Sequence, residues 1–375
     1  MARIVMKFGG TSVADLDRIE AVADRVAAEW ARGDEIAVVV SAMAGVTNQL
    51  VDWCRTIAPM HDAREYDSVV ATGEQVTAGL LAMALQGRGA PARSWLGWQL
   101  PFETDAAHGK ARIQRIEVAD LERRFAEERQ IPVLAGFQGR GADNRITTLG
   151  RGGSDTSAVA LAAALKADRC DIYTDVDGVY TCDPRIVTKA RRLDKVTYEE
   201  MLEMASLGTK VLQTRSVEMA MKHAVRLRVL STFTAPVGDP NVGTYVVGEE
   251  EIMEQAVVSG VAYSRDEAKI TVVGVPDQPG VAAAIFGPLT DEAINVDMIV
   301  QNISLDDGTT DMTFTVGLGE FDRALAALER SHDTLGYDRI VSDKNVVKIS
   351  VIGMGMRSHA GVAQTMFKAL AERGV

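Results

Sequence analysis

The chain of 375 residues is 47% apolar and 25% charged, the ordinary balance of a globular protein, and its length predicts two or three domains. A formal charge of -12 argues against binding to nucleic acid, because that affinity comes largely from Lys and Arg side chains that neutralise phosphates. No apolar run approaches the ~20 residues that a membrane span needs, and the amino terminus reads as a strand, so we expect a cytoplasmic protein without a membrane partner.

Residues 3–40 predict a strand, a helix and a second strand. The runs "RIVMKF" (3–8) and "EIAVVV" (35–40) are short, apolar and β-branched, which is typical of buried parallel strands. We expect Ser12 to cap the intervening helix, with Asp15 three residues further on. One face of that helix collects six apolar side chains, Leu16, Ile19, Ala23, Val26, Ala27 and Trp30.

The same alternation of strands and helices continues to about residue 176. A helix over 74–86 precedes the strand "IPVLAGF" (131–137), and a helix over 155–166 precedes the strand "CDIYTDV" (170–176). This order predicts an α/β fold, a mostly parallel sheet sandwiched by helices, with ligands at the carboxyl ends of the strands. We place the end of this first domain at residue 248, before the acidic run 249–251.

A repeat follows the acidic run. "KITVVGVPDQPGVAAAIFGPLTDEAI" (269–294) aligns with "KISVIGMGMRSHAGVAQTMFKALAERGV" (348–375), with two extra residues in the loop of the second copy. Each copy predicts a strand, a glycine-bearing loop and a helix. The first copy continues into "NVDMIVQNIS" and "DMTFTV", whereas the second ends where its next strand is due, so we expect a longer native reading frame. We assign 249–338 to one repeat domain and 339–375 to a partial second one.

Two glycine-rich turns stand between a predicted strand and a predicted helix. "KFGGTSV" (7–13) is either a tight turn with a helix cap or a phosphate cradle, since a helix amino terminus with a nearby lysine attracts anions. It lacks the GxxxxGK pattern of the P-loop. "TLGRGGSDTSA" (148–158) brings Gly150, Arg151 and Asp155 to a second such turn. Together the turns indicate one crevice with two anionic subsites.

Other polar side chains follow strands or open helices in the same domain. Capping is the simplest explanation for Ser41 and Thr47, and a favourable position beside the helix dipole is the simplest one for Glu74. The carboxylates of "DVDG" (175–178) are either turn formers or ligands of a nucleotide or metal. Cys54, Cys170 and Cys182 are odd in number and form no CxxC pair, so we expect reduced thiols and no protein-only metal site.

These motifs together resemble those of the aspartokinases in the amino acid kinase family, and the repeats resemble ACT domains. The resemblance covers essentially the whole chain, from "KFGGTSV" through "TGE", "TLGRGGSDTSA" and "DVDGVYTCDPR" to both repeats. It implies transfer of the γ-phosphoryl group of ATP, bound with Mg2+, to the β-carboxylate of L-aspartate, the first step towards lysine, threonine and methionine. It also implies feedback by lysine, threonine or both through the ACT domains.

The resemblance assigns roles to matching positions. The implied catalytic residues are Lys7, Arg151 and Asp155. The implied ATP-binding residues are Lys7, Phe8, Gly9, Gly10, Ser41, Thr174, Asp175, Tyr180, Arg185 and Lys210. The implied substrate-binding residues are Thr47, Glu74, Arg151, Gly152, Gly153 and Ser154. The implied effector-binding residues are Asp277, Gly280, Ala282 and Gln301.

Two alternatives remain open from the sequence. Another kinase of the same fold is opposed by Glu74 with Arg151, an acid and a base that suit a free amino acid. A non-catalytic, amino-acid-sensing subunit is opposed by the retention of Lys7, Arg151 and Asp155. The resemblance further implies a homo-oligomer formed through the ACT domains, with a short ACT-only partner subunit as an additional option.

Overall fold

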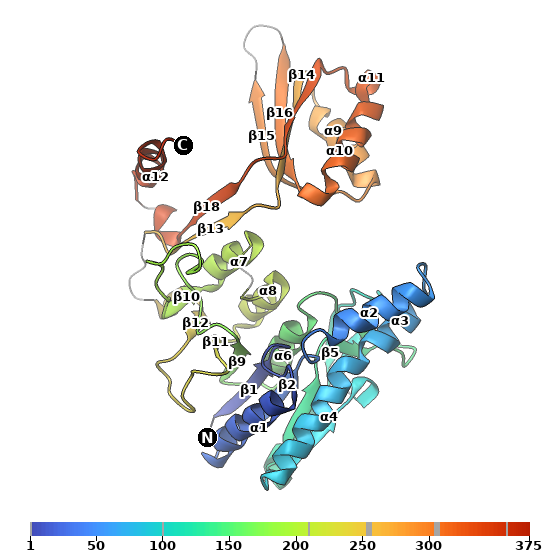
Figure 1. Ribbon diagram of the computed structural model, residues 1–375, viewed down its shortest axis with the longest axis vertical. Coiled ribbons are helices and arrows are strands. Elements are labelled where there is room, and N and C mark those ends of the chain that lie inside the picture. The colour runs from blue at the N-terminus through green and yellow to red at the C-terminus, as the bar shows by residue number, and fades with distance from the viewer. Residues whose placement is uncertain (1, 100, 209–210, 253–256, 304–307, 358) are drawn as a thin grey trace. The chain divides into compact units, whose positions relative to one another are not determined.

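The structure is a computed structural model that describes residues 2–99, 101–208, 211–252, 257–303, 308–357 and 359–375 (Figure 1). Contacts between residues divide the chain into two compact units, which we describe separately. The first comprises Met1–Gly260 with Ile352–Val375, and the second comprises Val261–Val351. The limits 1–248, 249–338 and 339–375 drawn from the sequence stay a prediction.

An eight-stranded sheet forms the centre of the first unit, in the order β10-β12-β11-β9-β1-β2-β6-β3. All its neighbouring strands are parallel except β11 and β12. The predicted mostly parallel sheet is therefore confirmed. Its strands are β1 (Arg3–Phe8), β2 (Glu35–Val40), β3 (Ala92–Trp95), β6 (Ile131–Ala135), β9 (Arg169–Thr174), β10 (Lys195–Thr197), β11 (Leu227–Ser231) and β12 (Thr244–Val247).

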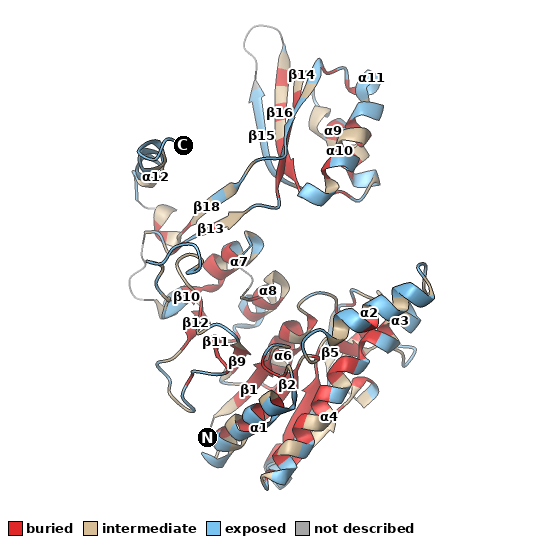
Figure 2. Ribbon diagram, viewed as in Figure 1, coloured by how far each residue is buried: buried red, intermediate tan, exposed pale blue. Residues whose placement is uncertain are grey.

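Helices cover both faces of this sheet. Ile4, Met6 and Phe8 pack in a core with residues of α1 and α4. Because side chains alternate along a strand, Val5 and Lys7 of β1 point to the opposite face, which α6 covers. Figure 2 shows the central strands and the inner side of α4 buried. The helices of the unit are α1 (Leu16–Ala31), α2 (Val46–Ile57), α3 (Ala63–Val70), α4 (Thr72–Gly87), α5 (Ala119–Glu128), α6 (Gly153–Ala164), α7 (Tyr198–Ser206), α8 (Thr214–His223) and α12 (Val362–Ala371).

The start of α1 differs from the sequence prediction. Asp15 is the N-cap, since its side chain accepts a hydrogen bond from the backbone N–H of Arg18 at 2.8 Å. Ser12 is buried, and its hydroxyl lies 2.6 Å from the hydroxyl of Thr232. The prediction of Ser12 as the cap was wrong because a turn over residues 10–13 delays the helix. Leu16 is 61% exposed instead of facing the core.

The stretch Ala63–Gly87, which holds α3 and α4, is by length and composition apolar enough to cross a membrane. Half of its most apolar window is buried inside the unit, and α4 packs against α1, β3 and β6. These contacts are those of a core helix. The sequence prediction that no apolar stretch reaches this length overlooked the continuity of the two helices.

A small four-stranded sheet flanks the large one in the order β5-β4-β7-β8. Its strands are β4 (Phe102–Thr104), β5 (Ile113–Ile116), β7 (Gln138–Arg140) and β8 (Ile146–Thr148), and the 3-10 turn η1 (Gly97–Gln99) precedes it. The last residue of β8 leads directly into the glycine cluster at 150–153. This small sheet therefore positions one wall of the candidate site.

The second unit carries a four-stranded antiparallel sheet in the order β15-β16-β14-β17. The predicted repeat is confirmed in its strands and helices: Gly280 and Gly361 cap α9 and α12 with φ of 95° and 94°. The remaining elements of the chain are β13 (Gly260–Ser264), β14 (Ala268–Pro276), β15 (Val296–Ile303), β16 (Thr309–Val316), β17 (Arg339–Asp343), β18 (Lys348–Ile352), α9 (Val281–Asp291), α10 (Phe321–Arg330), α11 (His332–Leu335) and the 3-10 turns η2 (Glu249–Glu251), η3 (Leu318–Glu320) and η4 (Met354–Arg357). Of these, η2 and η4 belong to the first unit, as α12 does.

Candidate active site

A cavity of about 340 Å³ opens where β1, β2 and β6 end, the position at which parallel α/β sheets bind ligands. The two glycine-rich motifs meet here, as predicted. Its lining comprises Gly10, Ser41, Ala42, Met43, Ala44, Gly45, Thr47, Asn48, Glu74, Phe137, Gly150, Arg151, Gly152, Gly153 and Ser154. All six residues predicted to bind substrate therefore line one cavity: Thr47, Glu74, Arg151, Gly152, Gly153 and Ser154.

Lys7 and Asp155 form an ion pair beside this cavity. Lys7 Nζ lies 2.6 Å from Asp155 Oδ1, and both residues are buried. Lys7 reaches Asp155 because its side chain points to the face of the sheet that α6 covers. One residue before Asp155, the hydroxyl of Ser154 lies 2.8 Å from that of Ser41. The ion pair joins the amino-terminal motif to the second glycine cluster, and the contact between the two hydroxyls joins that cluster to the end of β2.

Gly9 and Gly10 matter because they have no side chain, and not because their backbone adopts an unusual conformation. Neither adopts a positive φ. A Cβ on Gly9 would lie 3.4 Å from Lys7 Nζ, and one on Gly10 would lie 3.0 Å from the carbonyl oxygen of Ala42. The absent side chains leave the lysine ammonium and neighbouring backbone amides open to a bound anion.

Glu74 lies in the first turn of α4 and is only 4% exposed. Its Oε1 accepts a hydrogen bond from the N–H of Ala42 at 3.1 Å, while Oε2 has no hydrogen-bond partner in the part of the chain that the structure describes. Burial raises the pKa of this carboxyl to about 7. An unpartnered buried carboxylate oxygen in a cavity suits a cationic group of a ligand.

Arg151 lies in the loop between β8 and α6, and no carboxylate pairs with it among the described residues. Gly150 and Gly152 flank it with φ of +77° and +71°. A Cβ on Gly152 would overlap the side chain of Gln213. Helix α8 fixes the loop from the other side, because the guanidinium of Arg215 donates to the carbonyl oxygen of Leu149 at 2.7 Å.

Most residues predicted to bind ATP lie outside the cavity lining. Thr174 ends β9 next to β1, and its hydroxyl donates to Asp175 at 3.1 Å. Tyr180 donates to Asp177 at 3.0 Å, and Arg185 is exposed and pairs with Asp183. Lys210, which was also predicted to bind ATP, lies outside the described residues.

Phe8 is fully buried and stacks on Tyr173 at 4.6 Å, so its ring belongs to the core. Its carbonyl oxygen accepts from the N–H of Ser41 at 3.0 Å. Any contribution of Phe8 to a nucleotide site is therefore indirect, through the backbone path that leads to Gly9 and Gly10.

Sequence reasoning missed three contributors to the site. Phe137 lines the cavity with φ of 68°, a conformation that is rare for a bulky residue and recurs at functional sites. Gln213 and Arg215 act on the loop of Arg151 from more than 60 positions away. The glycine beside Phe137 is the one local signal, and nothing in the pattern of α8 indicates the contacts of its first residues.

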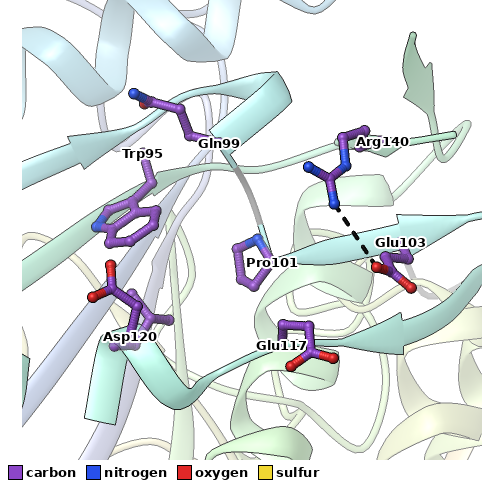
Figure 3. Close-up of a pocket in the computed structure, with 8 residues that line it drawn as sticks. Trp95, Gln99, Pro101, Glu103, Glu117, Asp120 and Arg140 are labelled. Atoms are coloured by element: carbon purple, nitrogen blue, oxygen red, sulfur yellow. Dashed lines mark ion pairs between the residues drawn. The ribbon is translucent and has the colours of Figure 1, made fainter. Parts of the chain in front are cut away.

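A second hollow lies next to the small sheet (Figure 3) and contains none of the predicted site residues. Glu103 pairs with Arg140 at 3.8 Å across it. Asp120 pairs with Arg123 and Arg124 on α5. Because its acidic groups already have cationic partners, this hollow offers a weaker site for a charged ligand than the cavity around Arg151.

The predicted effector residues belong to the second unit. Asp277 and Gly280 lie in the exposed loop between β14 and α9, and Ala282 follows in the first turn of the helix. Gln301 is exposed on β15, which β16 separates from β14. Two strand spacings of ~4.8 Å thus separate Gln301 from β14.

Comparisons with known proteins point to the same family over the whole chain. Residues 2–231 match the amino acid kinase family, and residues 269–333 and 349–375 each match the ACT domain. An aspartate kinase of Pseudomonas putida is 54% identical over 376 residues, covering 100% of this chain and 90% of its own length.

Two solved structures of Escherichia coli aspartokinase III are also similar. The R-state complex with aspartate and ADP is 27% identical, with a TM-score of 0.75 and coverage of 98% of this chain and 91% of its own. The T-state complex with lysine and aspartate is 28% identical, with a TM-score of 0.72 and coverage of 93% and 87%.

Fold, cavity and comparisons define an amino acid kinase domain followed by ACT domains. At 54% identity over its full length, the chain belongs to the aspartokinase family. It has the activity of an ATP-using aspartate kinase under feedback control through its ACT domains. The alternative of a non-catalytic sensing subunit is not supported.

Proposed function

We propose that the cavity around Arg151 holds L-aspartate while Lys7 receives the phosphates of ATP. The observation that carries this proposal is the arrangement of opposite charges around one cavity: the unpaired guanidinium of Arg151, the buried carboxylate of Glu74 and the nearby pair of Lys7 and Asp155. An α-amino acid carries one anionic and one cationic group at its α-carbon. Arg151 and Glu74 complement both.

In this arrangement Arg151 grips the α-carboxylate with its planar fork of donors, and Glu74 accepts from the α-ammonium. Thr47 and Ser154 donate or accept hydrogen bonds from the same cavity wall. Glu74 must be ionised for this role, which its raised pKa allows at and above neutral pH. The β-carboxylate is then left to face Lys7 and the glycine turn.

The reaction needs no general base, because the attacking β-carboxylate is already an anion. An oxygen of that carboxylate forms a bond to the γ-phosphorus of ATP as the bond to the bridging oxygen breaks and ADP leaves. Lys7 stabilises the charge on the transferring phosphoryl oxygens, and Asp155 orients Lys7. Gly9 and Gly10 let backbone amides approach the phosphates, and Ser41 lies beside them.

Thr174 and Asp175, at the carboxyl end of β9, complete the nucleotide site in this proposal together with Tyr180, Arg185 and Lys210, the last of which lies outside the described residues. The described ranges contain no cluster of three or more His, Cys, Asp or Glu side chains that would hold a metal ion. In this proposal an Mg2+ ion enters with ATP, is held mainly by phosphates and water, and neutralises phosphate charge. Because ATP is a cytoplasmic substrate, we place the enzyme in the cytoplasm.

For regulation, we propose that lysine, threonine or both bind at Asp277, Gly280, Ala282 and Gln301. The exposed start of α9 supports a carboxylate ligand there. Apolar side chains exposed on β15, including Met298 and Ile299, support pairing with another ACT domain, either in a second copy of this chain or in a short ACT-only subunit.

The test is ATP-dependent hydroxamate formation, in which hydroxylamine traps an acyl phosphate. We expect a signal with aspartate and none with glutamate or acetylglutamate, and we expect lysine or threonine, alone or together, to reduce it. A folded protein that binds aspartate without forming hydroxamate would refute the proposed site roles.

A further inference from the structure

A buried carboxylate outside the cavity, Asp67 of α3, is the centre of a hydrogen-bond cluster that the proposed mechanism does not use. Asp67 is 0% exposed. It accepts from the N–H of Thr148 at 3.0 Å, from the hydroxyl of Thr148 at 2.5 Å and from the N–H of Gly109 at 3.1 Å. His108 Nδ1 lies 2.7 Å from it.

The donors come from the two segments that surround the loop of Arg151. Thr148 is the last residue of β8, three positions before Arg151. Gly109 belongs to the loop before β5, and its carbonyl oxygen would lie 3.1 Å from a Cβ on Gly150. The N–H of Ala111 also donates to the carbonyl oxygen of Thr148 at 2.9 Å. Asp67 therefore holds in place both segments that pack against Gly150, the end of β8 and the loop before β5.

Asp67 also lies on the same helical stretch as Glu74. Helices α3 and α4 follow one another with a single residue, Ala71, between them. The hydrogen bonds of Asp67 thus tie the segment that carries Glu74 to the segment that carries Arg151. In the proposed function these two residues hold the ammonium and the carboxylate of one small substrate.

We propose that Asp67 is a positioning residue for aspartate, acting through Thr148 and Gly109 to set the distance between Arg151 and Glu74. The inference rests on the proposed function of those two residues. A buried carboxylate is costly unless donors compensate it, and a purely apolar contact would join two segments at lower cost. The directional bonds of a carboxylate define the position of the loop more narrowly.

The test replaces Asp67 with Asn. Asn has the same size as Asp, but its amide NH2 group cannot accept the hydrogen bonds that Thr148 and Gly109 donate to the carboxylate. The effect falls on substrate binding, because Arg151 grips aspartate in the ground state as well as in the transition state. We expect the KM for aspartate to rise about tenfold, since small misplacements of binding groups are costly. The KM for ATP and the kcat should stay within about threefold of the original values.

Glu29→Gln is the matched control. Glu29 is likewise a buried carboxylate, 2% exposed, that accepts from a loop N–H, that of Gly238 at 2.8 Å, but it lies away from the cavity. If both variants change the two KM values alike, Asp67 has only a structural role and the proposal is overturned. Arg151→Lys, assayed in parallel, separates this outcome from a failure of the proposed function, because an unchanged KM for aspartate in that variant would show that Arg151 does not grip the substrate.

Should Asp67→Asn fail to fold, Thr148→Val and Thr148→Ser provide the same comparison in milder form. Val removes only the hydroxyl that donates to Asp67, whereas Ser keeps it. We expect Val to raise the KM for aspartate severalfold and Ser to leave it near the original value. Equal KM values in the two variants would overturn the proposal.

Discussion

The ammonium of Lys7 and the carboxylate of Asp155 lie 2.6 Å apart, although 148 positions separate them in the chain. Lys7 lies on β1, an interior strand of the large sheet, and Asp155 lies on α6, the helix that covers the sheet face to which Lys7 points. The pair gives Lys7 a fixed position and keeps its charge next to the glycine turn. A preorganised charge of this kind contributes to a transition state without reorganisation during the reaction.

Replacing Lys7 with Ala should lower kcat by roughly 10²- to 10³-fold, the usual effect of removing one preorganised charge-stabilising donor. Steady-state hydroxamate assays measure it. Because the pair is expected to act as a unit, the double variant Lys7→Ala/Asp155→Asn should lose little more than the worse single variant. Unchanged turnover in Lys7→Ala, with a native circular dichroism spectrum, would contradict the proposed mechanism.

The KM for aspartate should fall as the pH rises through about 7, because Glu74 loses its proton in that range and can then accept from the substrate ammonium. Glu74→Gln should raise this KM and abolish its dependence on pH. Measurements between pH 6 and 8.5 at saturating ATP provide the check. A pH dependence that survives in Glu74→Gln would assign it to another group.

The same residue should lower the stability of the folded protein as the pH rises from about 4.5 to about 7. Its pKa is raised on folding, from 4.5 to about 7, so the folded state binds the proton more tightly and loses stability as the pH rises between these values. At pH 8 without ligand, Glu74→Gln should increase the free energy of unfolding by about 3 kcal/mol, at 1.36 kcal/mol per pKa unit. Urea denaturation at pH 5 and pH 8 measures it, and the gain should be small at pH 5.

Arg151→Lys should weaken aspartate binding by about ten- to a hundredfold, because a lysine keeps the charge but not the two parallel donors of the guanidinium. Isothermal titration with aspartate tests this directly. The affinity for ATP should change little. If Lys binds aspartate as tightly as Arg does, the grip on the α-carboxylate comes from another part of the cavity.

Gly152→Ala should be far more harmful than Gly89→Ala, although the two glycines have similar φ values of +71° and +76°. Both variants suffer the strain of a side chain at positive φ, about 1 kcal/mol. Only at Gly152 does the new Cβ also meet Gln213, since nothing lies within 4 Å of a Cβ at Gly89. Thermal unfolding and aspartate KM values compare the pair, and equal effects would show that backbone strain alone matters.

Local sequence patterns predicted the mostly parallel sheet and the two glycine-rich turns that line the cavity. Strands such as "EIAVVV" and the turns "KFGGTSV" and "TLGRGGSDTSA" were identified because apolar periodicity and glycine act within a few residues. The repeat was visible because its two copies align, and the positive φ of Gly280 and Gly361 shows that they share a helix cap. Placing both glycine turns at one crevice followed from the geometry of parallel sheets alone.

Tertiary contacts decided the chemistry of individual groups. Burial, which outweighs the hydrogen bond from the N–H of Ala42, raises the pKa of Glu74 to about 7. Ser12 does not act as the predicted helix cap, because its hydroxyl instead contacts that of Thr232, 220 positions away. The hydrogen bonds that Thr148 donates to Asp67 span 81 positions, and a pattern within one segment contains no information about a partner so distant. Desolvation and long-range hydrogen bonds arise only when segments pack together, so they remain invisible to a reading of local sequence.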